Sequence, residues 1–281
     1  MNTQPHFPAV IIGSTSMISL LLFSAGNPLP THAQNFANVS RTNQNFLISQ
    51  ASGSRIRFVP PVVKNPRQSQ GSGTRGCSNK PLEQNLVTLL IPSKDDIGQT
   101  ISSHPTFLWH LSQPVSVPMQ FALVEDKSGG QTIWKKQIDS PEPGIIQMEI
   151  PKDRPELVSG KTYRWTVTLV CNSKQPSANR YFISYIQRVS ATPALKQQLA
   201  TTPLNSNSSP KTIHSENALV DRERASVYAR SGLWYDAMST LSKAAKANPK
   251  DSLVQEDLFA LLDQVGLGEV VNQERQRLTK K

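Results

Sequence analysis

The chain has 281 residues and a mass of 31.0 kDa, which is enough for one large domain or two small ones. Hydrophobic residues make up 37% of it and charged residues 18%, so Ser, Thr, Asn, Gln and Pro supply much of the rest. This composition excludes a collagen, a coiled coil, a polytopic membrane protein and a highly charged disordered chain. It favours a moderate globular core joined to polar connecting segments.

The positive charge is concentrated near the amino terminus. The formal net charge is +10, and residues 1–82 hold seven basic and no acidic residues. Residues 83–190 carry a net charge of +1 and residues 191–281 a net charge of +2. A basic arm on nearly neutral domains predicts weak attraction to an anionic surface, with a solvated tail as the alternative. No nucleic-acid-binding motif accompanies it, so nucleic acid is not an expected partner.

Residues 1–33 have the pattern of a signal peptide. Apolar patches at 10–12 and 17–23 are too short and too interrupted to span a bilayer. Thr31 and Ala33 satisfy the small-x-small rule of signal peptidase, which predicts cleavage after Ala33. We therefore expect an exported protein, periplasmic or extracellular, with an uncleaved anchor as the alternative.

The expected mature chain begins with a polar segment and contains two cysteines. Residues 34–75 are polar and contain prolines, which predicts a largely disordered arm, although residues 55–58 alternate as a strand does. Cys77 and Cys171 are the only cysteines, and in an oxidising compartment they are expected to form a disulfide. The alternative is two free buried thiols.

Residues 76–190 have the pattern of a β-sandwich. Short apolar runs separated by turn residues are typical of an antiparallel sandwich, here a seven-stranded immunoglobulin- or fibronectin III-like one. The sixth run begins near Tyr163, whose hydroxyl is expected to bond back across the corner as in such folds. The seven runs are 86–91, 106–111, 119–124, 132–138, 145–150, 162–171 and 181–189.

Residues 191–213 read as a linker and residues 214–281 as a small helical module. Eight residues of this module follow the spacing of a tetratricopeptide repeat, with a plain helical hairpin as the alternative. One and a half repeats are too few for an independent solenoid, so we expect the helices to pack on the sandwich, a second copy or a partner. The spacing rests on Ala225, Tyr228, Gly232, Trp234, Ala237, Leu241, Ala244 and Pro249.

Four aromatic residues are candidate partner contacts, with packing as the alternative for the three in the helical module. Three of them belong to the helical module, and the fourth lies on an expected edge strand of the sandwich. They are Tyr228, Trp234, Tyr235 and Trp134.

No motif predicts a catalytic residue, a cofactor or a metal site. The glycines of residues 71–76 match a dinucleotide-binding spacing, but no strand precedes them and no helix follows. His104 and His110 lack partners at metal-ligand spacing. Four loop carboxylates are the only acid/base candidates, and nothing in the sequence pairs them across a bond. They are Asp95, Asp96, Glu125 and Asp126.

Several short motifs occur together in a characteristic order. They are Arg75-Gly76-Cys77, Pro105-Thr106-Phe107-x-Trp109, Pro143-Gly144-Ile145, Gly160-Lys161-x-Tyr163-x-Trp165, Cys171 and Gly232-x-Trp234-Tyr235-Asp236-Ala237. In combination they resemble a family of exported cyanobacterial proteins known as domain of unknown function 928. The resemblance implies export and joins sandwich and helices in one unit, and it implies no activity or site residue.

Together these features predict an exported, non-catalytic binding or adaptor protein of the cell envelope. The expected partner is a protein or an envelope glycan, with weak anionic-surface contact through the basic arm. Two alternatives stay open. The first is a carbohydrate-active or hydrolytic enzyme with a site on the sandwich loops, and the second is a purely structural envelope component.

Overall fold

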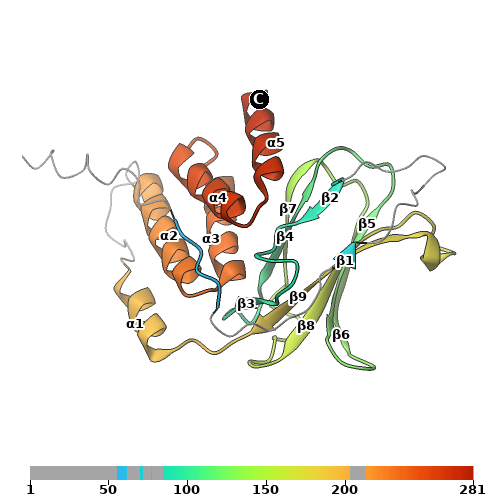
Figure 1. The fold of residues 1–281 in the computed structure, drawn as a ribbon, viewed down its shortest axis with the longest axis horizontal. Coiled ribbons are helices and arrows are strands. Elements are labelled where there is room, and N and C mark those ends of the chain that lie inside the picture. Colours follow the sequence, from blue (N-terminus) through green and yellow to red (C-terminus); the bar gives the residue numbers. More distant parts are fainter. Residues whose placement is uncertain (1–55, 62–69, 72–76, 78–84, 203–212, 281) are drawn as a thin grey trace, which may run out of the picture. The chain divides into compact units, whose positions relative to one another are not determined.

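The computed structural model describes residues 56–61, 70–71, 77, 85–202 and 213–280, all within one compact unit that spans Gly53–Lys281. The predicted signal peptide and its cleavage site lie outside the described residues. Within those residues, strands come first and helices follow, so the prediction of a mixed β-then-α fold is confirmed (Figure 1).

The strands form two sheets. The larger has the order β1-β9-β8-β5-β6, with β3 also paired to β9, and the smaller has the order β2-β4-β7. All seven predicted apolar runs contain a strand. The strands are β1 (Gln70–Gly71), β2 (Val87–Leu89), β3 (Gly98–Thr100), β4 (Thr106–Leu111), β5 (Met119–Glu125), β6 (Thr132–Ile138), β7 (Gly144–Glu149), β8 (Thr162–Leu169) and β9 (Arg180–Arg188).

The expectation of seven purely antiparallel strands needs a correction. The two- and three-residue strands β1 and β3 add to β9, and β3 pairs with it in parallel, Gly98 opposite Ile186. Neither strand shows apolar alternation, because both consist of Gly, Gln and Thr. Backbone hydrogen bonds define them, and a hydrophobic pattern cannot reveal such strands.

Strand β4 is buried on both faces. Phe107, Trp109 and Leu111 point into the core between the sheets, as their alternation predicted. The opposite face, which a two-layer sandwich leaves to solvent, is covered by helices. Ser239 of the helical module donates a hydrogen bond to Thr106 at 3.0 Å from that side. The helices therefore pack on the outer face of the smaller sheet, and α3 also reaches β3 of the larger sheet.

Two local predictions for the sheets are confirmed. The backbone N–H of Val158 donates to the Tyr163 hydroxyl at 2.8 Å, which is the corner hydrogen bond expected at the start of β8. Cys77 and Cys171 form a disulfide across 94 residues of sequence, with their Cα atoms 4.6 Å apart. It fastens the chain before β2 to the chain just after β8.

Among the residues that the structure describes, five helices follow the strands, and a single 3₁₀ turn, η1 (Pro176–Ala178), precedes β9. The segment predicted as a linker contains the first helix, whose start Thr192 caps by accepting the backbone N–H of Leu195 at 3.2 Å. The residues of that segment from 203 to 212 lie outside the described part. The helices are α1 (Pro193–Thr201), α2 (Ile213–Arg230), α3 (Trp234–Ala247), α4 (Ser252–Gln264) and α5 (Gly268–Thr279). In the described part of the chain, no helix has both the length and the apolar character needed to cross a membrane.

Eight residues of the predicted arm, 56–61 and 70–71, are described and have a defined place in the fold. Ile56 and Phe58 belong to the hydrophobic core, and residues 70–71 form β1. The alternation at 55–58 indicated such packing, although residues 56–61 belong to no strand. The other residues of the arm lie outside those described.

Candidate functional site

The first turn of α3 fastens the helices to both sheets. The Trp234 indole N–H donates to the carbonyl of Leu90 at 2.9 Å, beside β2. The Tyr235 hydroxyl accepts from the Trp165 indole at 3.0 Å and donates to the carbonyl of Tyr185 at 3.1 Å, on the larger sheet. Burial raises the pKa of the Tyr235 hydroxyl, which stays protonated and can make both bonds.

This junction corrects two of the predicted partner contacts. Trp234 and Tyr235 are 0% and 1% exposed, so they cannot reach an external partner and instead join parts of one unit. Tyr228 and Trp134 are half-buried and lie on α2 and β6, so the four residues do not form one patch. Trp134 packs on Phe121 with ring centroids 5.6 Å apart, at the edge strand where it was expected. A partner contact at Tyr228 or Trp134 stays a prediction.

A buried polar network fastens α5 to the smaller sheet. His110 of β4 lies 3.1 Å from a Glu274 carboxylate oxygen, and the other oxygen accepts from Arg277 at 2.7 Å. Burial raises the pKa of Glu274, but the bonds to His110 and Arg277 outweigh it and the net pKa is lowered. Arg277 also donates to the carbonyl of Pro143, and its guanidinium lies over Gly144. Gly144 is at φ 119°, a backbone conformation that favours glycine. His110 is therefore part of a structural hydrogen-bond network.

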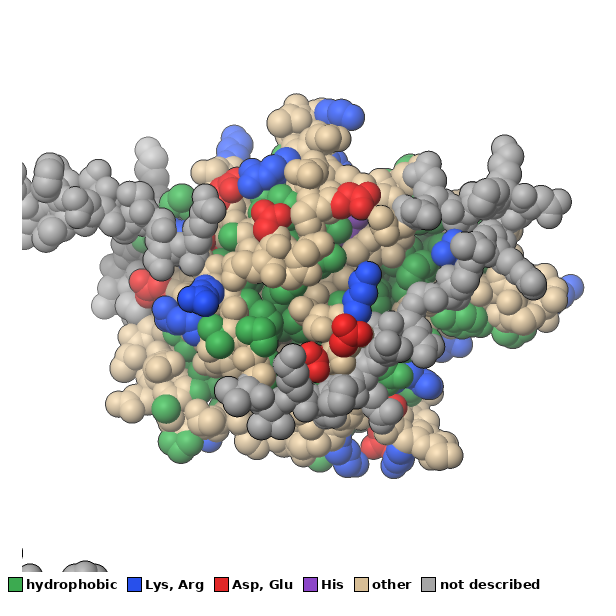
Figure 2. All heavy atoms as spheres, in the orientation of Figure 1, with side chains coloured by type: hydrophobic (Ala, Val, Ile, Leu, Met, Phe, Trp, Pro, Cys, Tyr) green, Lys and Arg blue, Asp and Glu red, His purple; other side chains and the backbone are tan. Residues whose placement is uncertain are grey.

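A groove of about 590 Å³ opens between β2, β9 and α5. Its lining combines apolar and polar side chains in about equal measure. Figure 2 shows hydrophobic side chains gathered in the middle of this face, with acidic and basic side chains around them. The lining residues are Asn85, Val87, Thr88, Leu89, Ile91, Ser93, Lys94, Phe182, Ile183, Val265, Gly266, Leu267, Glu269, Val270 and Gln273.

The wall that β2 contributes carries backbone hydrogen-bonding groups. Leu90 donates its N–H to β4, and Leu86 accepts from the chain just after β4 through its carbonyl, at 3.0 Å each. Because bonded positions alternate in an antiparallel pair, Val87 and Leu89 direct their backbone groups away from β4. Among the described residues β2 is an edge of its sheet, so these groups border the groove.

One end of the groove is closed by a bond between strand and helix. The Asn85 side-chain amide donates to Glu269 at 2.9 Å, and Gln273 donates to the other oxygen of Glu269 at 3.3 Å. These bonds set the spacing between β2 and the start of α5. Lys94 lies exposed on the lining and supplies a positive charge to the groove. The groove thus offers apolar surface, a strand edge and one cation.

A second, smaller cavity of about 360 Å³ lies at the junction of β3, β4 and α3. Asp236 borders it and accepts the backbone N–H of Ile101 at 3.1 Å. Burial raises the pKa of Asp236 to about 6, although hydrogen bonds from Thr100 and the backbone of Ile101 and Ser102 oppose the rise. The carboxylate is fully engaged by the β3–β4 loop, so we interpret it as a structural clamp.

The pKa of Asp236 predicts a pH dependence. A folded-state pKa of about 6 against an ordinary 3.8 means that the native state holds this proton more tightly than the unfolded state. Its contribution to stability is complete below about pH 4 and falls by about 3 kcal/mol as the pH rises through 6. The unfolding free energy of the wild type minus that of Asp236→Asn should fall by that amount between these pH values. Urea titrations at each pH measure it, and a constant or rising difference would refute the assignment.

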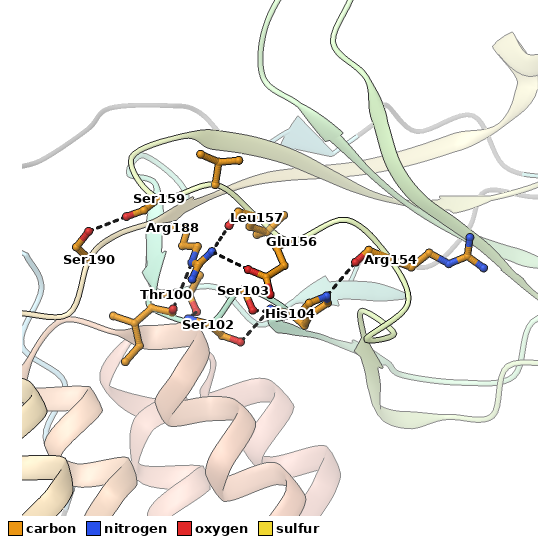
Figure 3. A network of polar contacts seen from close by, with 12 residues as sticks. Thr100, Ser102, Ser103, His104, Arg154, Glu156, Leu157, Ser159, Arg188 and Ser190 are labelled. Atoms are coloured by element: carbon orange, nitrogen blue, oxygen red, sulfur yellow. Dashed lines mark hydrogen bonds and ion pairs between the residues drawn. The ribbon is translucent and has the colours of Figure 1, made fainter.

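His104 is held beside this cavity in a chain of polar contacts (Figure 3). Its Nε2 lies 3.0 Å from the carbonyl of Arg154 and its Nδ1 lies 3.0 Å from the Ser103 hydroxyl. Since a carbonyl only accepts, Nε2 carries the proton and Nδ1 accepts from the serine. Arg188 continues the chain by donating to the carbonyls of Leu157 and Ile101. His104 thus acts in loop structure.

The loop carboxylates lie in two separate places. Asp95 and Asp96 belong to the connection between β2 and β3, next to the groove residue Lys94. Glu125 and Asp126 lie at the end of β5, and ion pairs from Lys127 and Lys161 lower the pKa of Glu125. In the described part of the chain, no group of three or more His, Cys, Asp or Glu side chains could hold a metal ion.

The groove residues at the α4–α5 turn and on α5 were not found from the sequence. Val265 and Leu267 of the turn and Val270 of α5 line the groove, but their apolar pattern fits ordinary helix packing equally well. The edge position of β2 could not be predicted either, because a local sequence pattern does not determine the order of strands in a sheet. Asp236 was visible only as part of the Gly232–Ala237 motif.

Two sheets carrying a helical layer, with a groove between them, define a β-then-α protein with a surface large enough for a ligand. The family model described as Domain of Unknown Function (DUF928) matches residues 70–275, and the chain belongs to that family. No curated protein matches the chain. Among solved structures, a multi-domain immunophilin from Arabidopsis thaliana matches at 10% identity, covering 78% of this chain and 100% of that one. Its TM-score of 0.21 carries no argument about the fold.

Proposed function

We propose that the protein is an exported, non-catalytic binding or adaptor protein whose groove between β2 and α5 takes up an extended polypeptide. The observation that carries this proposal is the edge of β2 along the groove. Val87 turns its N–H and carbonyl, and Leu89 its N–H, toward a ligand there, and an incoming strand can pair with such groups. The Leu89 carbonyl already accepts from the N–H of Ile91 at 3.1 Å. Backbone pairing supplies affinity, while apolar pockets select alternate side chains.

The lining supplies contacts that suit the side chains of a polypeptide. Phe182, Val265 and Leu267 offer apolar contacts, and Lys94 offers one charge for an acidic side chain or a carboxyl terminus. A volume near 590 Å³ accommodates a few side chains of an extended segment. The enzyme alternative of the sequence, built on Asp95, Asp96, Glu125 and Asp126, draws less support because those carboxylates lie in two separate loops.

We further infer an immunoglobulin- or fibronectin III-like origin for the two sheets. The order β2-β4-β7 against β6-β5-β8-β9, together with the Tyr163 corner bond, supports that assignment. A tetratricopeptide-like origin of α2 and α3 is supported by Gly232 at φ 77° in the turn and by the buried alanines 225, 229 and 237. Export, a cell-envelope location and weak anionic contact through the basic arm complete the proposal.

Panning a displayed library of ten-residue peptides on residues 34–281, the predicted mature chain, tests the proposal. The selected peptide should bind Val87→Pro about tenfold more weakly than the wild type, because one backbone donor is lost. Proline is tolerated at a strand edge, and the N–H it removes points away from β4. Val87→Ala is the matched control, since it trims the side chain and keeps the N–H.

Two outcomes would refute the groove as the binding site. One is that no peptide is enriched, and the other is that Val87→Pro and Val87→Ala bind equally well. Release of sugar fragments from cell-wall glycan by the same preparation would favour the enzyme alternative instead.

A further inference from the structure

A short extended segment of the chain lies across the helical module like a bound peptide. Residues 56–61 belong to no helix or strand and run beside α2 and α3 (Figure 1). The Gln264 side-chain amide, 206 residues further along, accepts the N–H of Phe58 at 2.9 Å and donates to the carbonyl of Ile56 at 2.8 Å. Val59 donates its N–H to the carbonyl of Ala229, at the end of α2, at 3.0 Å. Three bonds thus hold the segment by its backbone.

The side chains of the segment alternate between buried and exposed. Ile56 and Phe58 are 3% and 8% exposed, whereas Arg57 and Val59 point to solvent. The Phe58 ring meets Trp234 edge-on with centroids 5.0 Å apart. The helices therefore provide two pockets for alternate apolar side chains.

After Phe58 the segment continues to Pro61, whose ring packs against Gly232. A Cβ on Gly232 would lie 3.1 Å from the ring of Pro61, so the α2–α3 turn leaves room for that ring. Gly232 is also at φ 77°, a conformation that glycine adopts without strain. The recognised pattern is apolar, any residue, apolar, two residues, proline.

These contacts are the kind that an external polypeptide also makes. Gln264 and the Ala229 carbonyl bind backbone groups that every residue except proline carries. The two pockets require only apolar side chains at alternate positions. Nothing in this recognition requires the segment to be part of the same chain.

We propose that the helical module carries a polypeptide-binding site for an extended apolar-x-apolar segment, which residues 56–61 occupy as a built-in ligand. A partner polypeptide with the same pattern takes their place. The site is separate from the groove beside β2, because its residues Gln264, Ala229 and Trp234 do not line that groove.

Residues 56–61 compete with a free peptide for the site, and their covalent link to the chain favours them. A segment linked to its own site has an effective concentration on the order of 1 mM. A free peptide with an affinity near 10 μM for the empty site would thus bind the wild type about 100-fold more weakly. The site is best assayed with the built-in ligand disabled.

The first test uses a labelled peptide of residues 53–62 and the chain of residues 34–281. The double variant Ile56→Ser with Phe58→Ser should bind it about 100-fold more tightly than the wild type, by fluorescence anisotropy. Adding Gln264→Ala should weaken that binding about tenfold. Gln276→Ala, which removes an amide of the same size from the exposed face of α5 and lies outside the groove, should leave it unchanged. A peptide with serine at both apolar positions should not bind.

A second experiment keeps the native segment, in case the double variant fails to fold. A protease site placed within residues 62–69 is cut after folding, which leaves residues 56–61 held only by their contacts. Excess labelled peptide should then replace the original segment at one per chain. Retention of the original segment without exchange, unfolding on its release, or equal uptake of the serine peptide would overturn the proposal.

Discussion

Replacing Cys77 and Cys171 by serine is expected to lower the free energy of unfolding by about 4–5 kcal/mol. The disulfide closes a loop across 94 residues, and closing a loop of that length removes much of the conformational entropy of the unfolded chain. It also fixes the chain that leads into β2, and β2 forms one wall of the groove.

Urea unfolding of the wild type and the double variant, with and without reductant, measures this loss. Reductant should shift the midpoint of the wild type to that of the variant and leave the variant where it is. A loss below about 1 kcal/mol, or an equal effect of reductant on both proteins, would contradict the structural role of the bridge.

Trp234→Ala is expected to cost about 3–5 kcal/mol. The indole is fully buried at the point where α3 meets β2, so its removal leaves a cavity there. It also strips the Leu90 carbonyl of its donor and Phe58 of its ring partner.

Trp234→Phe is the matched control, because it keeps an aromatic ring and loses the indole N–H. It should cost less than half as much as alanine in equilibrium unfolding. If alanine costs no more than about 1 kcal/mol, the helices and sheets are not fastened together at this residue.

The strands of the two sheets were largely predictable, and their partners were not. Alternation located β4 and β8 because a half-buried strand must place apolar residues on one face. It could not reveal that the outer face of β4 is also covered, because Thr106 and His110 are polar residues whose partners lie on distant helices. Long-range pairing of this kind leaves no trace in a local pattern.

For the aromatic residues of α3, too, a local pattern does not reveal the partners that they contact. Their position in a repeat-like motif marked Trp234 and Tyr235 as important, and they are. Whether such residues face a partner or the chain's own sheets depends on the packing of the two parts. Their indole and hydroxyl groups find buried partners within the chain.

Of the candidate sites, only the disulfide could be derived in advance, because two cysteines allow one pairing. The groove beside β2 depends on sheet order, and the site for residues 56–61 depends on one glutamine that no motif distinguishes. Both arise where segments far apart in sequence meet.

Amide hydrogen exchange, resolved by residue, tests the central claim most directly. It compares residues 34–281 alone with the same chain saturated by the peptide selected through panning. We predict that the N–H groups of Val87 and Leu89 gain protection, whereas those of Thr88 and Leu90, which face β4, do not change. Protection that appears elsewhere and leaves Val87 and Leu89 unchanged would contradict strand pairing in the groove.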